Sequence, residues 1–373
     1  MLLCVLLCAG SVFLLKNMFE NGVTEEITAR HYKIQTITSL VGVVFALILA
    51  ALDYKKIAKI WFIFAPFALI LQGLLFTSLG KSVNAADDIG WLNLGFTTIQ
   101  PSELLKTAFI VTFALHLSKL GPKINNVFHL VLVGIHGMIP TGLVMLQGDD
   151  GTCLVFLGVF LIMLFAAGLW WRYVAIIAAL IPVGAFVMWT YVMKSFQKLR
   201  FLVVYDKATQ EAEARGLYYQ QLYALRALGS GEMTGKGLDG QGYTYIPVVE
   251  SDFIYAYVGM TLGFIGCIAV AAVILLICGG LIRVSFASKD DLGKLICVGV
   301  FAVIFVHSVI NIGMVLSVVP VVGIPLPFIS AGGTQTLALF LDIGLVLSVY
   351  SHRYTKRKHM FYEENDKAVN FRI

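Results

Sequence analysis

Charged residues are scarce in this 373-residue chain, and their scarcity excludes an ordinary soluble domain. Only 13% of the residues are Asp, Glu, Lys or Arg, whereas soluble domains carry about 25%. The formal net charge of +5 is not gathered into a patch of basic and aromatic residues, so nucleic-acid binding is not indicated. Hydrophobic residues make up 59% of the chain, which predicts a polytopic membrane protein.

Cysteine chemistry is also lacking. The six cysteines lie in or beside apolar runs, no CxxC pair occurs, and no Cys–His cluster has the spacing of a zinc site. We interpret them as small buried hydrophobic residues. The N-terminus has neither the basic lead-in nor the small-residue cleavage site of a signal peptide. Residues 1–15 are therefore predicted to form a first span, although a span usually needs ~20 residues.

Long apolar runs predict an all-α protein with about ten transmembrane helices, since only helices or closed barrels satisfy the backbone in lipid. The predicted spans are 1–15, 34–52, 57–79, 101–118, 128–147, 153–170, 173–193, 253–280, 294–318 and 334–350. One large loop, residues 194–252, separates the seventh and eighth spans. Residues 207–228 of this loop have helical spacing, consistent with an amphipathic helix on the outer leaflet or with a plain loop helix.

The distribution of lysine and arginine predicts the orientation. One set of short loops contains Lys55, Lys56, Lys59, Lys119, Lys123, Arg172, Arg283, Lys289 and Lys294. The opposing short loops contain fewer basic residues, so the first set is predicted to be cytoplasmic. Both termini then lie in the cytoplasm, residues 1–351 form one transmembrane domain with an extracytoplasmic loop at 194–252, and residues 352–373 form a basic cytoplasmic tail.

Two carboxylates, Glu250 and Asp252, stand at the start of the charge-free run 253–280. An ionised Asp at a bilayer centre costs roughly 2.5–3.5 kcal/mol on insertion scales, and less near the interface. A carboxylate at a membrane edge is therefore a candidate site. The alternative is that Asp252 only caps a helix where water begins.

The segment QPSELLK, residues 100–106, opens the fourth predicted span. Pro101 suits the first helical position, and Glu103 and Lys106 are three residues apart, so they can pair on one helix face. They form either a stabilising ion pair in a capped helix or a site in which Lys106 is a cation facing a polar cavity.

Asp149 and Asp150 lie between the fifth and sixth spans. They indicate either a tight polar turn or a site for a divalent cation, Mg²⁺ or Mn²⁺, with oxygen ligands. Residues 319–333 contain three prolines and three glycines, so they are predicted to be non-helical and either buried in protein or lining a cavity. The glycines between 229 and 242 lack the spacing of a P-loop. We interpret the four span histidines as core residues or helix–helix hydrogen-bonding groups; they are His116, His129, His136 and His307.

Taken together, these motifs resemble those of the SEDS family of RodA, FtsW and SpoVE. GWLNLG with QPSELLK resembles the family's RWI-x-LG and QPSE-x-x-K, and GDDGT resembles QPDLGT. GSG, GKGL and ESDFIYAYVG resemble GSGG, GKGLG and E-x-TDFIFA-x-x-G. NIGM and GIPLPFISAGG resemble NIGM and GIPLPF-x-SYGG. The blocks occur in the family's order over nearly the whole chain.

The resemblance implies a ten-helix membrane glycosyltransferase that polymerises lipid II on the outer face, with a class B penicillin-binding protein as partner, in cell shape, division or sporulation. By motif match, the family's catalytic Asp falls on Asp252, and its Trp, Glu and Lys positions fall on Trp91, Glu103 and Lys106. Its QPD acid falls on Asp149, the candidate metal ligand. Gln100 and Glu250, which belong to the same motifs, are further candidates for substrate contact.

The chain departs from the family pattern at five positions. Gly90 replaces the Arg before Trp, Gly148 replaces the Pro of QPD, Met260 and Thr261 replace two acids, and Ala331 replaces the Tyr of SYGG. These changes bear on substrate handling or partner contacts more than on the fold.

Our hypothesis is inverting glycosyl transfer, with Asp252 as the base and Lys106, or a cation held with Asp149, opposite the departing pyrophosphate. Trp91 and the proline-rich segment would shape the groove. Two alternatives are a flippase for the lipid-linked precursor and a non-catalytic scaffold for a penicillin-binding protein. A flippase should place polar groups near the midplane of broken helices.

Overall fold

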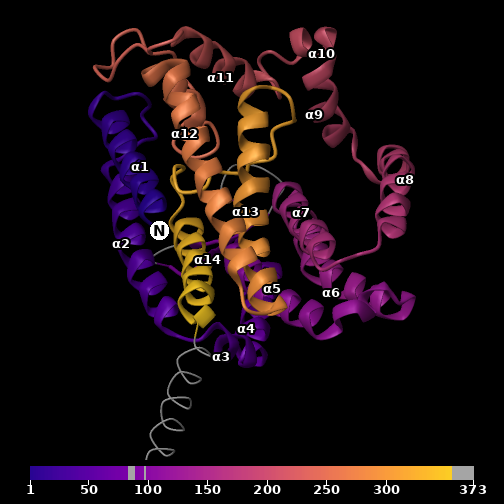
Figure 1. The fold of residues 1–373 in the computed structure, drawn as a ribbon. Helices are drawn as coiled ribbons and strands as arrows, with labels where there is room; N and C mark the ends of the chain where they lie inside the picture. The colour runs from indigo at the N-terminus through magenta and orange to yellow at the C-terminus, as the bar shows by residue number, and fades with distance from the viewer. Residues whose placement is uncertain (83–88, 96–97, 355–373) are drawn as a thin grey trace, which may run out of the picture.

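The computed structural model describes residues 1–82, 89–95 and 98–354 as an all-helical bundle with one small sheet (Figure 1). The ten helices at the predicted spans are α1 (Leu2–Glu20), α2 (Ala29–Ala51), α4 (Trp61–Gly73), α5 (Pro101–Leu120), α6 (Val127–Leu146), α7 (Asp150–Ala166), α8 (Trp171–Val187), α12 (Ile254–Ala287), α13 (Asp291–Val315) and α14 (Gly333–Ser351). Eight apolar helices are long enough to cross a membrane, and Trp61–Phe76 and Asp150–Ala166 are shorter apolar helices. The predicted fold class is therefore confirmed.

Short elements connect these helices. Helix α3 (Tyr54–Lys59) joins α2 to α4, and 3₁₀ turns cover Leu74–Phe76, Gly121–Asn125 and His352–Tyr354. A π-helical turn, Met188–Val192, extends α8. Strands β1 (Gly80–Lys81), β2 (Trp91–Asn93) and β3 (Thr98–Ile99) form an antiparallel sheet in that order, with Gly80 opposite Leu92 and Leu92 opposite Ile99. The predicted tail, 352–373, falls mostly on residues 355–373, which lie outside the described residues.

Helix α13 forms the centre of the bundle, in contact with α5, α7, α12 and α14. Helix α14 packs along α2, where small residues allow a close approach: a Cβ at Gly42 would overlap Phe340, and one at Gly344 would crowd Ala46. This is the packing expected between membrane helices, where small residues let backbones approach. Helix α8, in contrast, has no buried residue and stands apart from the bundle in Figure 1.

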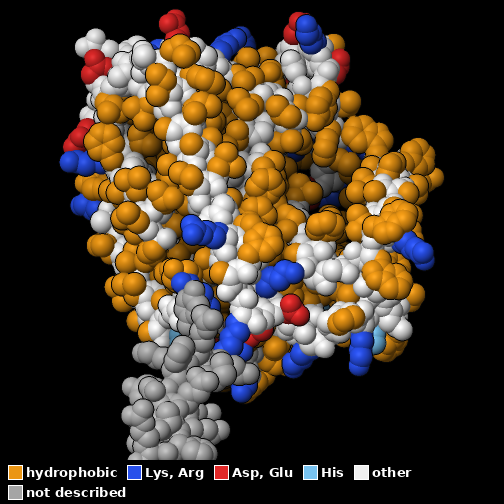
Figure 2. Space-filling view, viewed as in Figure 1, with side chains coloured by type: hydrophobic (Ala, Val, Ile, Leu, Met, Phe, Trp, Pro, Cys, Tyr) orange, Lys and Arg blue, Asp and Glu red, His pale blue; other side chains and the backbone are white. Residues whose placement is uncertain are grey.

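The surface is apolar around the middle of the bundle. Figure 2 shows hydrophobic side chains over most of the visible face, with lysine and arginine gathered toward the lower end of the view, where α3 lies in Figure 1. Acidic side chains are prominent at the opposite end, over the α10 and α11 region. This pattern fits a helical bundle that spans a bilayer.

The predicted continuous span 253–280 is wrong in one respect: α12 folds back on itself at Gly263. That residue has φ 67° and ψ −167°, a conformation that L side chains rarely adopt. Tyr255 Oη donates to Cys267 O at 3.2 Å, although residues twelve apart on one continuous helix would be about 18 Å apart. Residues 254–262 therefore form a short arm that runs beside the long helix beginning at Phe264.

The large loop also differs from the prediction of one amphipathic helix over residues 207–228. It forms α9 (Ser195–Tyr205), α10 (Lys207–Ala212) and α11 (Tyr219–Ser230). Helix α10 ends at Ala212, and the carboxylate of Glu213 accepts a hydrogen bond from Leu217 N at 3.2 Å. Helix α11 packs on α12, and Gln221 Nε2 donates to Met314 O and Val319 O at 3.1 and 2.8 Å. Helix α11 is thus part of the protein's packing.

The turn between α12 and α13 is held by Asp290. Its carboxylate accepts hydrogen bonds from Tyr54 Oη at 3.0 Å and from Gly293 N at 3.0 Å, and it pairs with Lys55 Nζ at 2.5 Å. Partial burial raises the pKa of this carboxyl, but the hydrogen bonds from Lys55, Gly293 N and Tyr54 outweigh burial and leave the pKa below its usual value.

We expect Asp290→Ala to lower the free energy of unfolding by about 1–2 kcal/mol at pH 7, since it removes a helix cap and an ion pair. Because the folded-state pKa is depressed, the stabilisation by Asp290 is present above the unfolded-state pKa of about 3.9 and is lost as the pH falls through the folded-state value. Thermal unfolding of the purified proteins in detergent should therefore show a difference in Tm between wild type and Asp290→Ala that becomes smaller as the pH is lowered. Asp290→Asn is the control that keeps a capping side chain; a difference between Ala and wild type that did not change with pH would contradict this account.

Candidate active site

The backbone of residues 250–252 is fixed by three consecutive carbonyl groups. Glu250 O accepts from Ala331 N at 2.8 Å, Ser251 O accepts from Ser330 Oγ at 2.5 Å, and Asp252 O accepts from Asn311 Nδ2 at 2.8 Å. All three donors come from α13 or from the segment that follows it. Since the carbonyls are held in sequence, the Glu250 and Asp252 side chains start from a rigid base.

Asp252 is half-buried at the foot of the short arm of α12. Nine arm residues correspond to a rise of about 13 Å between this foot and the turn at Gly263, so the structure places Asp252 below that turn. The N-cap position of α12 is Phe253 rather than Asp252. Close by, Glu250 Oε2 is buried and has no hydrogen-bond partner in the described part of the chain. A buried acceptor without a donor is costly, so this oxygen is suited to meet a ligand.

The proline-rich segment, residues 319–332, is irregular and buried, as predicted. Residues along this segment contact several candidate site residues in turn. Val322 O lies against Gly151, where a Cβ would overlap it, and Gly323 faces the Asp252 carboxylate. Ile324 O accepts from Asn311 Nδ2 at 2.7 Å. The segment therefore brings the Asp149–Gly151 turn and Asp252 to adjacent positions.

The glycine-rich loop clamps the turn at the top of the arm. Lys236 N donates to Met260 O at 2.9 Å and Gly237 N to Thr261 O at 3.1 Å. On the other side of the turn, Phe264 N donates to Glu232 O at 2.9 Å. A Cβ at Gly231, Gly235 or Gly263 would overlap backbone atoms of the facing strand of chain. These glycines thus serve close backbone packing, which fits the prediction that they are not a P-loop.

Lys106 and Glu103 form the predicted pair on α5, and the structure adds a third partner. Lys106 Nζ donates to Glu103 Oε1 at 2.7 Å and to His307 Nε2 at 2.8 Å. The Lys106 side chain is only 3% exposed, so in this structure it does not open to solvent. Because His307 Nε2 accepts from the ammonium, its Nδ1 carries the hydrogen and faces Pro325 O at 3.4 Å. His307 therefore links the pair to the proline-rich segment.

Asp342 completes this buried cluster from α14. It is fully buried, on the helix that packs against α5 beside Lys106 and Glu103. Gln335, about two turns earlier on the same face of α14, places Nε2 3.3 Å from His307 Nδ1. Sequence reasoning missed Asp342, although it is the only charged residue within Gly333–Ser351. The sequence indicated only that His307 is a core or hydrogen-bonding histidine. Because His307 lies 201 residues from Lys106, nothing in the sequence predicted the contact between them.

The remaining candidates lie in the small sheet and at the helix starts that follow it and Gln147. Trp91 lies half-buried in β2. Gln100 is the N-cap residue of α5, and its backbone N donates to Thr334 Oγ1 at 3.4 Å. Gly148, which replaces the Pro of QPD, has φ 80°, a conformation that proline cannot adopt. The turn before α7 therefore has a backbone that the family's proline would exclude.

Asp149 is the N-cap of α7 and accepts from Thr152 N at 2.9 Å, and Asp150 accepts from Gln197 Nε2 at 2.8 Å. Both bonds fit the alternative of a polar turn. In the residues described, no group of three or more His, Cys, Asp or Glu side chains is arranged to hold a metal ion.

We expect Lys106→Met to destabilise the protein by about 3–5 kcal/mol, since it leaves the Glu103 carboxylate buried without its cation. Adding Glu103→Gln to Lys106→Met should recover most of that loss, because a neutral amide costs less to bury. Thermal unfolding of the single and double variants measures this coupling. Additive losses in the double variant would show that the two side chains do not depend on each other.

Comparison with protein-family models matches residues 1–355 to the cell cycle protein family of FtsW, RodA and SpoVE. Peptidoglycan glycosyltransferase MrdB of Escherichia coli K12 is 33% identical over 270 residues, which cover 70% of this chain and 71% of that protein. Probable peptidoglycan glycosyltransferase FtsW of Trichlorobacter lovleyi is 30% identical, covering 91% and 87% of the two chains. Stage V sporulation protein E of Bacillus subtilis is 29% identical, covering 87% of each.

Solved structures agree on the fold. A mutant of the rod shape determining protein RodA of Thermus thermophilus superposes with a TM-score of 0.67 at 25% identity, covering 94% of this chain and 97% of that one. A chain of a peptidoglycan synthase complex superposes with a TM-score of 0.77 at 24% identity, covering 94% and 98%. The likeness extends over almost the full length of each chain.

Proposed function

We propose a mechanism and a substrate from one established premise: the chain belongs to the SEDS family of FtsW, RodA and SpoVE and is a multi-pass membrane peptidoglycan glycosyltransferase. Its family acts in cell shape, division or sporulation. Within that premise, we propose that it polymerises lipid II at the outer face of the cytoplasmic membrane, with Asp252 as the general base.

The proposed reaction is a direct, inverting displacement. A sugar hydroxyl of one lipid II attacks the anomeric carbon of another chain, and the new C–O bond forms as the bond to the lipid pyrophosphate breaks. The hydroxyl proton passes to the Asp252 carboxylate, and the pyrophosphate leaves with the electron pair. General-base assistance of this kind is typically worth about 10²–10⁴-fold in rate.

The observation that carries the proposal is the fixed backbone of residues 250–252. A base must be held within hydrogen-bond reach of the proton it removes, and three carbonyl bonds fix the main chain from which Asp252 extends. The buried Glu250 Oε2 two residues away supports the proposal, because it is an acceptor available to a substrate hydroxyl.

We assign Lys106 to the leaving pyrophosphate. The ammonium stands about one and a half turns into α5, where Glu103 neutralises it in the ground state. An entering pyrophosphate competes with Glu103 for the ammonium, and charge that develops on the leaving oxygen is stabilised in a site from which water is excluded. The first turn of α5, at Pro101, directs its dipole toward the same anion. We place Trp91 and Gln100 at the rim of the groove and Asp149 beside it.

The same proposal fixes the orientation and the partner. We propose that both termini lie in the cytoplasm and residues 194–252 outside, within one domain that covers residues 1–351; the basic residues of the short loops support this orientation. A class B penicillin-binding protein would supply cross-linking; support comes from the similar chain found in a peptidoglycan synthase complex.

The alternative of a flippase is weaker. Its expected signature, a broken membrane helix next to polar groups, does occur at Gly263. A broken helix also explains how Asp252 comes to lie below the turn at Gly263. In addition, the similar proteins are the peptidoglycan glycosyltransferase MrdB and the probable peptidoglycan glycosyltransferase FtsW. The same similarity disfavours a non-catalytic scaffold.

We expect Asp252→Asn to reduce glycan polymerisation by about 10²–10⁴-fold, because the amide keeps the shape but not the basicity. The assay is purified protein with a class B partner and lipid II, with product length read on a gel. Glu250→Gln is the matched control two residues away and should lose much less. Normal polymerisation by Asp252→Asn would end the proposal for this base.

The role of Lys106 is tested by the Glu103→Gln, Lys106→Met double variant. Since this variant should fold, any loss of activity reports function rather than stability. We expect polymerisation to stay strongly depressed, with lipid II binding weakened. Recovery of activity together with stability would show that Lys106 has only a structural role.

We expect an impermeant thiol reagent on intact cells to label a Cys at the exposed Gln241 but not one at the exposed Lys289, in a Cys-free background. Gln241 lies in the 194–252 loop, whereas Lys289 lies between α12 and α13. Labelling at Lys289 without labelling at Gln241 would reverse the orientation.

A further inference from the structure

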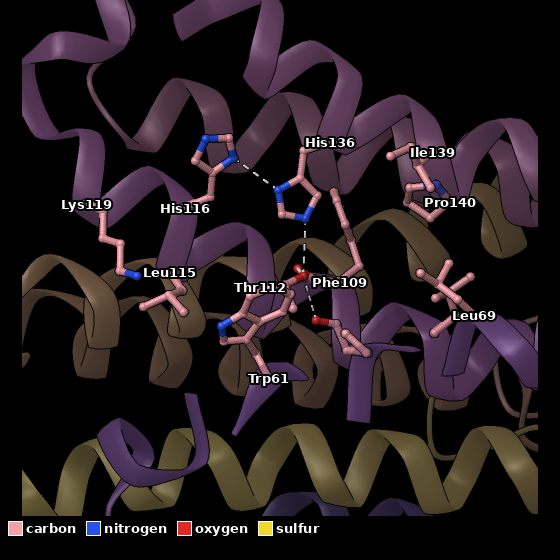
Figure 3. A pocket seen from close by; sticks show the side chains of 13 residues that line it. Trp61, Leu69, Phe109, Thr112, Leu115, His116, Lys119, His136, Ile139 and Pro140 are labelled. Carbon is pink, nitrogen blue, oxygen red and sulfur yellow. Dashed lines mark hydrogen bonds between the residues drawn. The ribbon is translucent and has the colours of Figure 1, made fainter. Parts of the chain in front are cut away.

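A cavity lies outside the candidate active site, between α4, α5 and α6 (Figure 3). Its volume is about 380 Å³, and it is partly open at the bundle surface. Helix α5 supplies its long wall, through residues from Leu105 to Lys119 at three- and four-residue intervals. None of the residues that line it belongs to the catalytic proposal.

The length of the cavity along α5 matches that of one membrane lipid. The fourteen steps from Leu105 to Lys119 correspond to about 21 Å along the helix axis. One leaflet, with its headgroups, is about 20–22 Å thick. A lipid in this cavity would therefore extend from Lys119, near the C-terminal end of α5, to within about one turn of Pro101.

The wall is graded in polarity along that length. At the deep end lie Leu105, Phe109 and Leu69, which are apolar. His116 and Lys119 stand at the other end, as Figure 3 shows. Lys119 lies one residue before the end of α5, beside the short loop that contains Lys123. This is the polarity of a lipid, with its acyl chain inside and its headgroup at the rim.

A chain of hydrogen bonds orients the two histidines. Thr112 Oγ1 donates to Ala108 O at 3.0 Å, so it accepts from His136 Nε2 at 3.3 Å. His136 Nδ1 is then the acceptor for His116 Nδ1, 3.1 Å away. His116 Nε2 is left without a hydrogen-bonding role toward the residues described. It becomes a donor only on protonation.

Charge selects the headgroup. The lining contains Lys119 and two histidines but no Asp or Glu. Within the described ranges, Lys119 takes part in no ion pair. A basic residue close to an anionic lipid is worth about 1 kcal/mol in attraction, whereas a zwitterionic headgroup would bring its own cation against Lys119.

We propose that this cavity binds one anionic glycerophospholipid of the leaflet bordered by the short basic loops. The phosphate lies between Lys119 and His116, and an acyl chain lies along Phe109 and Leu105. Trp61 closes the rim from α4, an interfacial position that tryptophan favours. The bound lipid fills the gap between α4, α5 and α6.

The test is lipid titration by native mass spectrometry of the purified full chain. Phosphatidylglycerol and phosphatidylcholine with the same acyl chains are compared, and glycerol phosphate alone serves as the headgroup without a tail. We expect the first phosphatidylglycerol to bind on the order of 5- to 10-fold more tightly than phosphatidylcholine. Glycerol phosphate should not compete, because it lacks the chain.

Two variants test the charged and apolar ends separately. His116→Leu with Lys119→Gln should abolish the preference for phosphatidylglycerol, and Ala65→Phe, which fills the cavity from α4, should weaken binding of both lipids. Lys289→Gln, an exposed lysine on another loop with the same charge sign, should change nothing. Thermal unfolding confirms that each variant is folded.

Several results would overturn the proposal. Equal affinity of the wild type for both lipids would contradict selectivity for an anionic headgroup. Loss of preference in Lys289→Gln to the same extent would show that the attraction is a general surface effect. Unchanged binding in Ala65→Phe would place the lipid elsewhere, and competition by glycerol phosphate would indicate a phosphate site without a lipid.

Discussion

The proline-rich segment 319–332 is the structural constraint on which the candidate site depends. It cannot be helical, so its backbone groups are free to bond elsewhere, and in a buried place each must find a partner. Ala331 N holds Glu250, Ile324 O and Asp252 O share the amide of Asn311, and Pro325 O faces His307. One irregular stretch therefore positions both the carboxylate pair and, through a histidine, the buried lysine.

Helix α5 has two distinct faces. One carries Glu103 and Lys106 into the centre of the bundle against α13, and the other lines the cavity shared with α4 and α6. The buried face is stabilised by the Glu103–Lys106 ion pair, and removing either charge leaves the other buried without compensation. The outer face is held by comparatively loose packing around a void. Rigidity of this helix therefore depends on what fills the void as well as on its ion pair.

Hydropathy was sufficient to predict the ten helices, because a run of apolar residues in lipid has few other solutions. The Glu103–Lys106 pair followed from three-residue spacing alone. The reversal at Gly263 did not, since an apolar run has the same composition whether it continues or folds back. His307, Asn311 and Asp342 were beyond reach for another reason: their roles depend on contacts across the bundle, and local sequence carries no record of them. The departure at Gly148 is visible in the sequence, but its positive φ is a property of the folded turn.

The clamp around Gly263 is built almost wholly from main-chain atoms, with Lys236 N, Gly237 N and Phe264 N as donors and carbonyls as acceptors. This joint needs glycine at the positions of close approach, because a Cβ there would overlap backbone atoms. It does not need particular side chains at the neighbouring positions, because its hydrogen bonds are made by backbone groups. Met260 and Thr261 stand at this joint where the family pattern has acids, yet their carbonyls accept the same bonds. The path of the chain at this joint therefore depends on backbone bonds, and replacing the side chains of Met260 and Thr261 would leave Asp252 at the same depth below it.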